Sequence, residues 1–103
     1  GGMGMNSGFQ DGINLARKII EIETGADPDA LLDRYDRQRR LTAIEYVQAQ
    51  SIANKRLLEE KDADVRKSRL DDLRVTVADA AKHLDFVKRA SLISMWEKSE
   101  EIA

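Results

Sequence analysis

The stretch that decides the fold is GGMGMNSGFQDGINLARKIIEIETGADP, residues 1–28. Its first eight residues hold four of the six glycines in the chain. Such a density is typical of backbone that needs positive φ angles or that approaches a neighbouring group closely. Apolar side chains then recur every three or four residues, at Phe9, Ile13, Ala16 and Ile20. This period predicts a glycine loop over 1–8 and a helix over 9–25 that is buried along its apolar face.

The ends of this first helix carry their own signals. Ser7, with Gln10 three residues later, matches the capping-box pattern for a helix start. Asp11 is expected in the first turn, where the helix dipole favours a negative charge. Gly25 is placed to end the helix as the residue after its C-cap. We therefore expect the helix to be bounded by Ser7 and Gly25.

A second helical region is predicted over 27–61. Asp27 is suited to the N-cap, and Pro28, the single proline, fits the first helical position. No glycine or proline interrupts the residues that follow, up to residue 61. One long helix, or two helices that meet near Arg40 to Thr42, would both fit this pattern.

Further helices are predicted over 64–98. Asp62 or Asp64 can cap the first of them, and Asp79 can begin a fresh one. The polar tail, residues 97–103, is expected to fray. Since no alternating strand pattern appears, we expect an all-α chain, with four to five helices in an extended or bundle-like arrangement and no sheet.

Composition excludes several classes of function. The formal net charge is −2, so there is no net basic field to attract nucleic acid. The absence of cysteine excludes disulfides and cysteine-based zinc sites, and a single histidine, His83, excludes a multi-histidine metal site. No targeting segment or apolar run long enough for a bilayer is visible, so a cytoplasmic location is expected. No catalytic residue and no metal site is predicted.

One local feature points to a ligand. Backbone N–H groups converge after Gly4, Met5 and Asn6, where the positive end of the first helix dipole lies. Such a helix terminus favours an anion or an electron-rich carbonyl. A flexible glycine stub, and an anion site unrelated to any cofactor, remain alternatives.

The same residues resemble a known family. The pattern Gly-Gly-x-Gly-Met-Asn-x-Gly-x-x-Asp, continued by Asn-Leu-Ala-x-Lys, occupies residues 1–18 and is similar to the C-terminal flavin motif of FAD-dependent aromatic hydroxylases. The leucine pair, tyrosine and arginine run over 31–41 extend the resemblance. Gly12 replaces the alanine usual in the family, and Leu41 replaces its usual proline, which would let a helix continue.

The resemblance implies that this is the C-terminal helical segment of a larger α/β flavoprotein that hydroxylates an aromatic ring with FAD and NAD(P)H. It implies that the N–H groups of Met5 and Asn6 bond the flavin pyrimidine carbonyl and that Gly4 permits close approach of the ring. An upstream FAD-binding and substrate domain would be the partner. The 103 residues alone are expected to be inactive and not to hold FAD.

A different class of function also fits the sequence. The chain could be a stand-alone helical module whose apolar stripes pack against a partner or against a second copy of itself. Met95 and Trp96 are expected to be core, or an interface that another domain covers. Arg37, Arg39 and Arg40 could bind a phosphate, but a solvated face, or pairing with Asp33 and Asp36, is favoured. His83 is expected to be structural or exposed.

Overall fold

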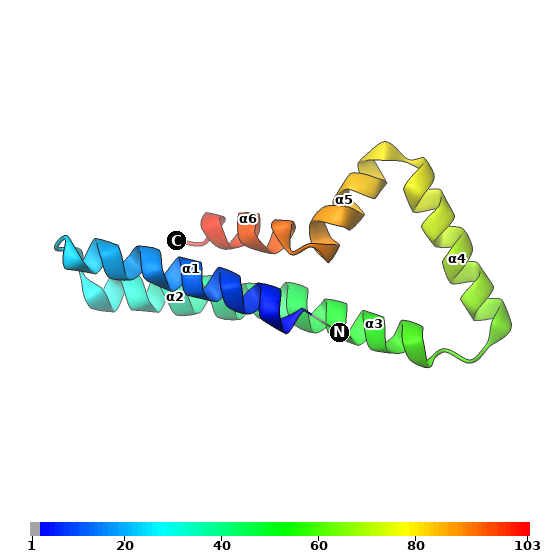
Figure 1. The fold of residues 1–103 in the computed structure, drawn as a ribbon, viewed down its shortest axis with the longest axis horizontal. Coiled ribbons are helices and arrows are strands. Elements are labelled where there is room, and N and C mark those ends of the chain that lie inside the picture. The colour runs from blue at the N-terminus through cyan, green and yellow to red at the C-terminus, as the bar shows by residue number, and fades with distance from the viewer. Residues whose placement is uncertain (1–2) are drawn as a thin grey trace.

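The structure is a computed structural model that describes residues 3–103, so Gly1 and Gly2 of the predicted glycine loop lie outside the described residues. Helices form nearly all of it, and no strand occurs between Met3 and Ala103. The elements are α1 (Gly4–Glu23), α2 (Pro28–Thr42), the π-helical segment η1 (Ala43–Gln48), α3 (Ala49–Glu59), α4 (Ala63–Ala78), α5 (Ala80–Ala90) and α6 (Ile93–Glu101). The all-α prediction is confirmed (Figure 1). Among the described residues, no helix is long and apolar enough to cross a membrane.

Three aspartates begin helices by accepting backbone N–H groups that would otherwise lack a partner. Asp27 accepts from the amide of the second residue of α2, and Pro28 occupies the first position of that helix, as predicted. Asp62, not Asp64, caps α4, which settles an alternative that the sequence left open. Asp79 caps α5 as predicted. These starts follow from local chemistry, so they can be recognised without knowledge of the fold.

The region 28–59 is one uninterrupted helix, which settles the second open alternative. α2 continues directly into η1, and η1 into α3, with no residue between them. Leu41 has a backbone N–H where a proline would remove one, so the helical hydrogen bonds continue through this point. The π-helical segment follows Thr42, close to the predicted junction, and widens the helix where Tyr46 turns into the core.

The start of α1 differs from its prediction. The helix begins at Gly4 rather than at Phe9, and Met3 takes the N-cap position without a side-chain cap. Ser7 is buried inside the first turns and does not cap the helix. The side-chain amide of Gln10 donates to the carbonyl oxygen of Leu92 at 2.9 Å instead of completing a capping box. The predicted capping box therefore does not form, because Ser7 is buried and Gln10 makes a tertiary hydrogen bond. Gly25 ends the helix with φ of +104°, as predicted.

The prediction that the apolar stripe of α1 is buried is wrong. Phe9 is 64% exposed, Ile13 50% and Ile20 65%. The opposite side of α1, which includes Asn14 and Lys18, packs against α2 instead. α1 thus buries its polar side within the chain and leaves its apolar side uncovered.

The buried apolar core is small and lies where η1 meets the start of α6. It consists of Met3, Tyr46, Leu92 and Met95, with Ala43 and Val47 packed against it. Leu92, fully buried, adopts a left-handed φ of 62° and turns the chain from α5 into α6. The expectation of a core position is confirmed for Met95, whereas Trp96 is only partly buried.

The C-terminal tail is docked rather than frayed, contrary to prediction. α6 continues to Glu101, and Ser99 near its end is fully buried. The carbonyl oxygen of Ile102 accepts hydrogen bonds from Arg34 at 3.2 Å and from Gln38 at 2.9 Å. These long-range bonds to α2 hold the end of the chain in place.

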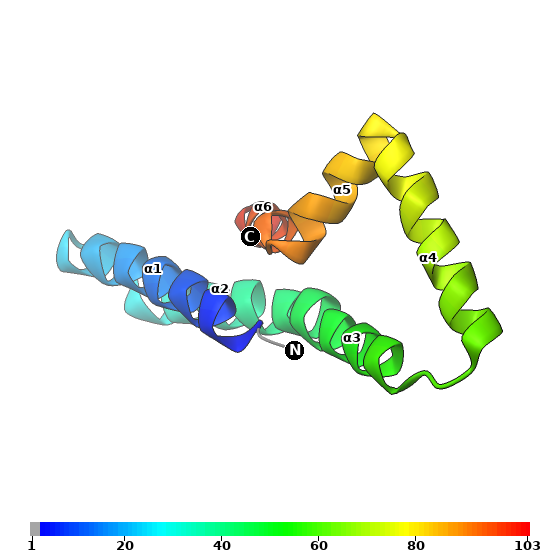
Figure 2. The same cartoon turned by 45° about the vertical axis from the view of Figure 1, so that its right-hand side comes forward.

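The chain is extended, with two unequal parts. α1 and α2 run antiparallel, with α6 packed on α2, whereas α3, α4 and α5 form an open arm (Figures 1 and 2). The radius of gyration is 17.4 Å, against about 13 Å for a compact domain of this length. The arm accounts for the difference, because α4 lies far from the paired helices.

Candidate functional site

The N-terminus of α1 presents free backbone donors. The first hydrogen bond of this helix runs from the amide of Ser7 to the carbonyl oxygen of Met3, at 3.1 Å. The N–H groups of Gly4, Met5 and Asn6 come before that bond, so they have no acceptor within the helix. All three residues are exposed, and Met5 is 72% exposed. The structure therefore brings the three predicted site residues together on one helical turn, at its positive end.

Glycines line one side of the same helix. Gly4, Gly8 and Gly12 are four residues apart, a spacing that places them on one face. A methyl group added at any of them would meet nothing within 4 Å, and none of the three has a positive φ. Glycine inside a helix costs about 1 kcal/mol relative to alanine. Nothing among the described residues requires glycine at Gly8 or Gly12, so the flat strip is free for a group from outside this chain.

The uncovered apolar stripe of α1 runs beside this glycine strip. Met5, Phe9 and Ile13 also follow one another at intervals of four residues and are all at least half exposed. An apolar stripe next to bare backbone forms a surface that a planar group or a second protein layer can approach closely. This surface continues directly from the free N–H groups of the first turn.

A buried polar layer, which was not predicted from the sequence, holds α1 against α2. Lys18 donates its ammonium protons to the side-chain oxygens of Asn14 and Gln38, the latter at 2.6 Å. Asn14 also donates to Gln38, at 3.1 Å. Burial lowers the pKa of Lys18, and the positive charge of Arg34 lowers it further. A signal was present in the sequence, since Asn14 and Lys18 lie one turn apart on the side of α1 opposite its apolar stripe.

An ion pair fixes the N-terminal half of α1. Arg39 on α2, only 5% exposed, donates from Nε to a carboxylate oxygen of Asp11 and from Nη2 to Gln10 at 3.3 Å. The predicted placement of Asp11 in the first turn of the helix is wrong, because α1 begins earlier. Asp11 pairs with a buried arginine instead of compensating the dipole. The pair sets the position of α1, and hence of its first turn, along α2.

The remaining candidates are surface groups. Arg40 pairs with Asp36 at 2.8 Å, as expected, and its hydrogen bonds lower the pKa of Asp36. Arg37 donates to the carbonyl oxygen of Ala103 at 3.2 Å. His83 is exposed on α5. In the part of the chain that the structure describes, no group of His, Cys, Asp and Glu side chains could hold a metal ion.

Comparison with known proteins finds similarity over the region that contains this surface. Residues 1–50 match a family described as FAD binding domain. A 12-dehydrotetracycline 5-monooxygenase/anhydrotetracycline 6-monooxygenase from Streptomyces rimosus is 48% identical over 40 residues, which are 39% of this chain and 8% of that protein. A 3-(3-hydroxy-phenyl)propionate/3-hydroxycinnamic acid hydroxylase from Mycolicibacterium vanbaalenii is 39% identical over 54 residues, 52% of this chain and 10% of that protein. The corresponding hydroxylase from Mycolicibacterium smegmatis is 49% identical over 39 residues, 38% of this chain and 7% of that protein. No solved structure matches the chain.

These matches show a partial similarity to FAD-binding monooxygenases. The aligned segments span about a tenth or less of the curated relatives. The matched region includes α1, α2 and η1, and the family match ends at residue 50, at the start of α3.

Proposed function

We propose that this chain is the C-terminal helical part of an FAD- and NAD(P)H-dependent monooxygenase that hydroxylates an aromatic ring. The observation that carries the proposal is the exposed first turn of α1, where the N–H groups of Gly4, Met5 and Asn6 lie beside an unfilled glycine strip. The similarity to FAD-binding proteins falls on the same residues. The polar layer is buried between α1 and α2 and offers no such surface.

The residues at this turn suit a flavin ring. The amides of Met5 and Asn6 would donate to the pyrimidine carbonyl, and the glycine strip leaves room for a flat ring against the backbone. When bound, the flavin would supply the oxidation–reduction chemistry of the enzyme. The chain would contribute oriented donors at a positive helix end, which stabilise negative charge on a reduced ring.

The polar layer and the ion pair give these donors a fixed position. Lys18 and Arg39 tie both halves of α1 to α2, so the first turn cannot tilt freely. Orientation that is established before binding is what makes such donors effective. We assign Asp11 and Arg39 to the positioning of the turn, and we assign no residue of this chain to catalysis.

An FAD-binding and substrate domain upstream is the partner that this proposal requires. That domain would cover the apolar stripe of α1, which the chain leaves exposed at Phe9, Ile13 and Ile20. The 103 residues alone would then neither retain FAD nor turn over substrate. A cytoplasmic location belongs to the same proposal.

The test removes one donor at a time in the longer protein that contains this segment. Met5→Pro deletes one N–H in the first turn, a position where a helix tolerates proline. Met5→Leu keeps the N–H and changes only the side chain. We expect Met5→Pro to lower the midpoint reduction potential of bound FAD and Met5→Leu to leave it close to the original value. A folded longer protein that binds no FAD would refute the proposal.

A second candidate function is a stand-alone helical interaction or oligomerisation module. It is favoured by α3, α4 and α5, which contain no buried residue. The two functions are compatible, because they use different helices.

A further inference from the structure

α4 is a helix without a packing partner along most of its length. Of its residues, only Arg69 and Thr76 are partly covered, and the others are exposed. Leu70 is 54% exposed and Val77 62% exposed. An isolated helix of this length is marginal in water, and most helical stability in proteins comes from packing of one face. Something must therefore cover α4 for the arm to keep this conformation.

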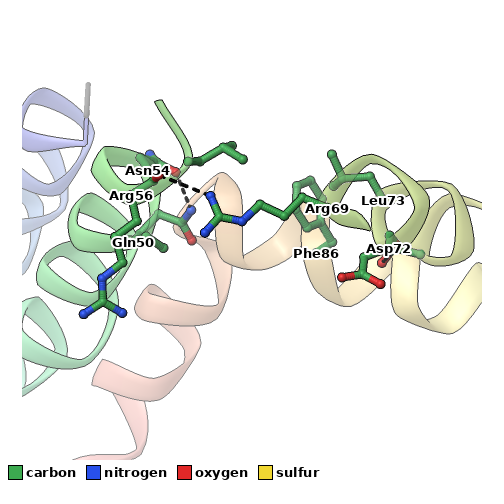
Figure 3. A pocket seen from close by; sticks show the side chains of 10 residues that line it. Gln50, Asn54, Arg56, Arg69, Asp72, Leu73 and Phe86 are labelled. Carbon is green, nitrogen blue, oxygen red and sulfur yellow. Dashed lines mark hydrogen bonds between the residues drawn. The ribbon is translucent and has the colours of Figure 1, made fainter. Parts of the chain in front are cut away.

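A cleft lies between α3 and the pair formed by α4 and α5. Its volume is about 540 Å³, and its walls come from α3 on one side and from α4 and α5 on the other (Figure 3). Ala53 and Leu57 supply apolar lining from α3, and Leu73 and Phe86 supply it from α4 and α5. The cleft is thus an apolar groove between helices that has no fourth helix to fill it.

The surface area indicates the size of the missing contact. The chain exposes 7309 Å², whereas a compact protein of its mass, 11.6 kDa, is expected to expose about 5,800 Å². The excess is about 1,500 Å². Each subunit of an obligate homodimer buries roughly 1,000 to 2,500 Å² in the interface, so the excess lies within that range. The uncovered stripe of α1 contributes part of this excess, and the open arm, which a second chain would cover, contributes to the rest.

Three charged side chains line the cleft, and Arg69 among them pairs with Glu60 of the same chain at 3.9 Å, which leaves two charges of opposite sign. Arg56 lies on the α3 wall, with its guanidinium directed away from α4, and Asp72 lies on the α4 wall (Figure 3). Within residues 3–103, neither side chain takes part in an ion pair. A two-fold axis would bring Arg56 of one copy to Asp72 of the other, twice in each dimer. A strongly acidic or basic partner would satisfy only one of the two charges.

The cleft also lies outside the region shared with flavoproteins. The family match ends at residue 50, and apart from Gln50 all the residues that line the cleft follow that point. The surface suited to an FAD-binding domain is the apolar side of α1, on a different helix. A shared flavin domain is therefore a poor occupant for the cleft.

We propose that the cleft receives α4 of a second copy of this chain, so that two arms form an antiparallel, two-fold symmetric dimer. The exposed apolar residues Leu70, Leu73 and Val77 of α4 would enter the partner's cleft while its own cleft receives theirs. This inference gives the second candidate function a defined surface, and it does not depend on flavin binding.

Sedimentation equilibrium of the 103-residue chain tests the proposal. We expect a mass of twice 11.6 kDa. Leu73→Glu or Phe86→Glu should weaken the dimer at least tenfold, because each puts a charge into the apolar groove. Leu58→Glu is the matched control, since Leu58 is 84% exposed on α3 but does not line the cleft; it should leave the dimer intact.

Charge exchange provides a test that does not depend on apolar packing. Arg56→Glu or Asp72→Arg alone should weaken dimerisation, because each places like charges together across the interface. The double variant should recover most of the original affinity, because a two-fold interface restores both pairs. A monomeric parent chain, or a dimer that Leu73→Glu leaves unchanged, would overturn the proposal. Either result would leave the Met5→Pro experiment, and the flavin proposal with it, unaffected.

Discussion

The glycines of α1 yield the sharpest prediction, because the structure contains no reason for two of them. Gly8 and Gly12 lie within the helix with ordinary negative φ, and a methyl group at either would meet nothing within 4 Å. In the double variant Gly8→Ala/Gly12→Ala, the added methyl groups restrict the unfolded chain and favour the helix. No contact within the chain is lost in exchange.

The expected gain follows from helix propensity. Each substitution is worth about 1 kcal/mol in a helix interior, so the pair should stabilise the chain by about 2 kcal/mol. For a domain of this size, such a gain corresponds to a rise in Tm of roughly 10 °C. Thermal unfolding followed by far-UV circular dichroism at fixed protein concentration measures it.

Gly25→Ala is the matched control with the opposite sign. Gly25 has φ of +104°, which alanine adopts only with strain. That variant should lose about 1 kcal/mol and lower Tm. The same chemical change is thus predicted to stabilise at two positions and destabilise at the third, which excludes a general effect of alanine.

In the longer protein that we propose contains this segment, the same Gly8→Ala/Gly12→Ala substitutions should be harmful to FAD binding. If the glycine strip admits a flavin or a covering domain, added methyl groups will hinder that approach and reduce the FAD content of the purified protein. A fall in Tm of the 103-residue chain on Gly8→Ala/Gly12→Ala would refute the reasoning, because it would mean that the glycines serve contacts within this chain.

Three further predictions concern the polar contacts that hold α1, α2 and the tail together. Burial lowers the pKa of Lys18 below its ordinary value of 10.5. Between the pKa of the folded chain and that ordinary value, the unfolded chain binds more protons than the folded one, so the free energy of unfolding should rise with pH across that window. In titrations of stability, the difference between the parent chain and Lys18→Met should show this rise, and a difference without pH dependence would contradict it. Arg39→Ala should cost about 2 kcal/mol in urea denaturation, since it removes the hydrogen bond to the charged Asp11 and the one to Gln10. Arg40→Ala, at an exposed pair, is the control and should change stability much less. Equal losses would count against the distinction. Deletion of residues 102–103 should destabilise the chain by about 1 to 2 kcal/mol, because Gln38, which is 2% exposed, loses its acceptor; unchanged amide exchange in α6 would show that the tail is not held by these bonds.

Local sequence chemistry was a good guide to where most helices begin and end. Asp27, Asp79 and Gly25 act within one turn of their own position, so their effect does not depend on what packs nearby. The start of α1 was misplaced for the opposite reason. Ser7 has the right chemistry for a cap, but in the fold it is buried in the helix.

The candidate site was only partly accessible from sequence. The motif pointed to Gly4, Met5 and Asn6, and the structure places all three on the exposed first turn of α1. The sequence shows the polar side of α1 but not the partners of Lys18 and Arg39, because Gln38 and Asp11 are 20 and 28 residues away from them along the chain. Such pairs form only when two helices meet.

By itself, the sequence determined that this chain is helical and where most of its helices are capped. These properties depend on hydrogen bonds and dihedral angles within a few residues. Only the tertiary structure decided which side of each helix is covered. The periodicity of α1 predicts an apolar side but not whether this chain contains the surface that buries it. Among the described residues it does not, so the polar side faces α2 and the apolar side stays exposed.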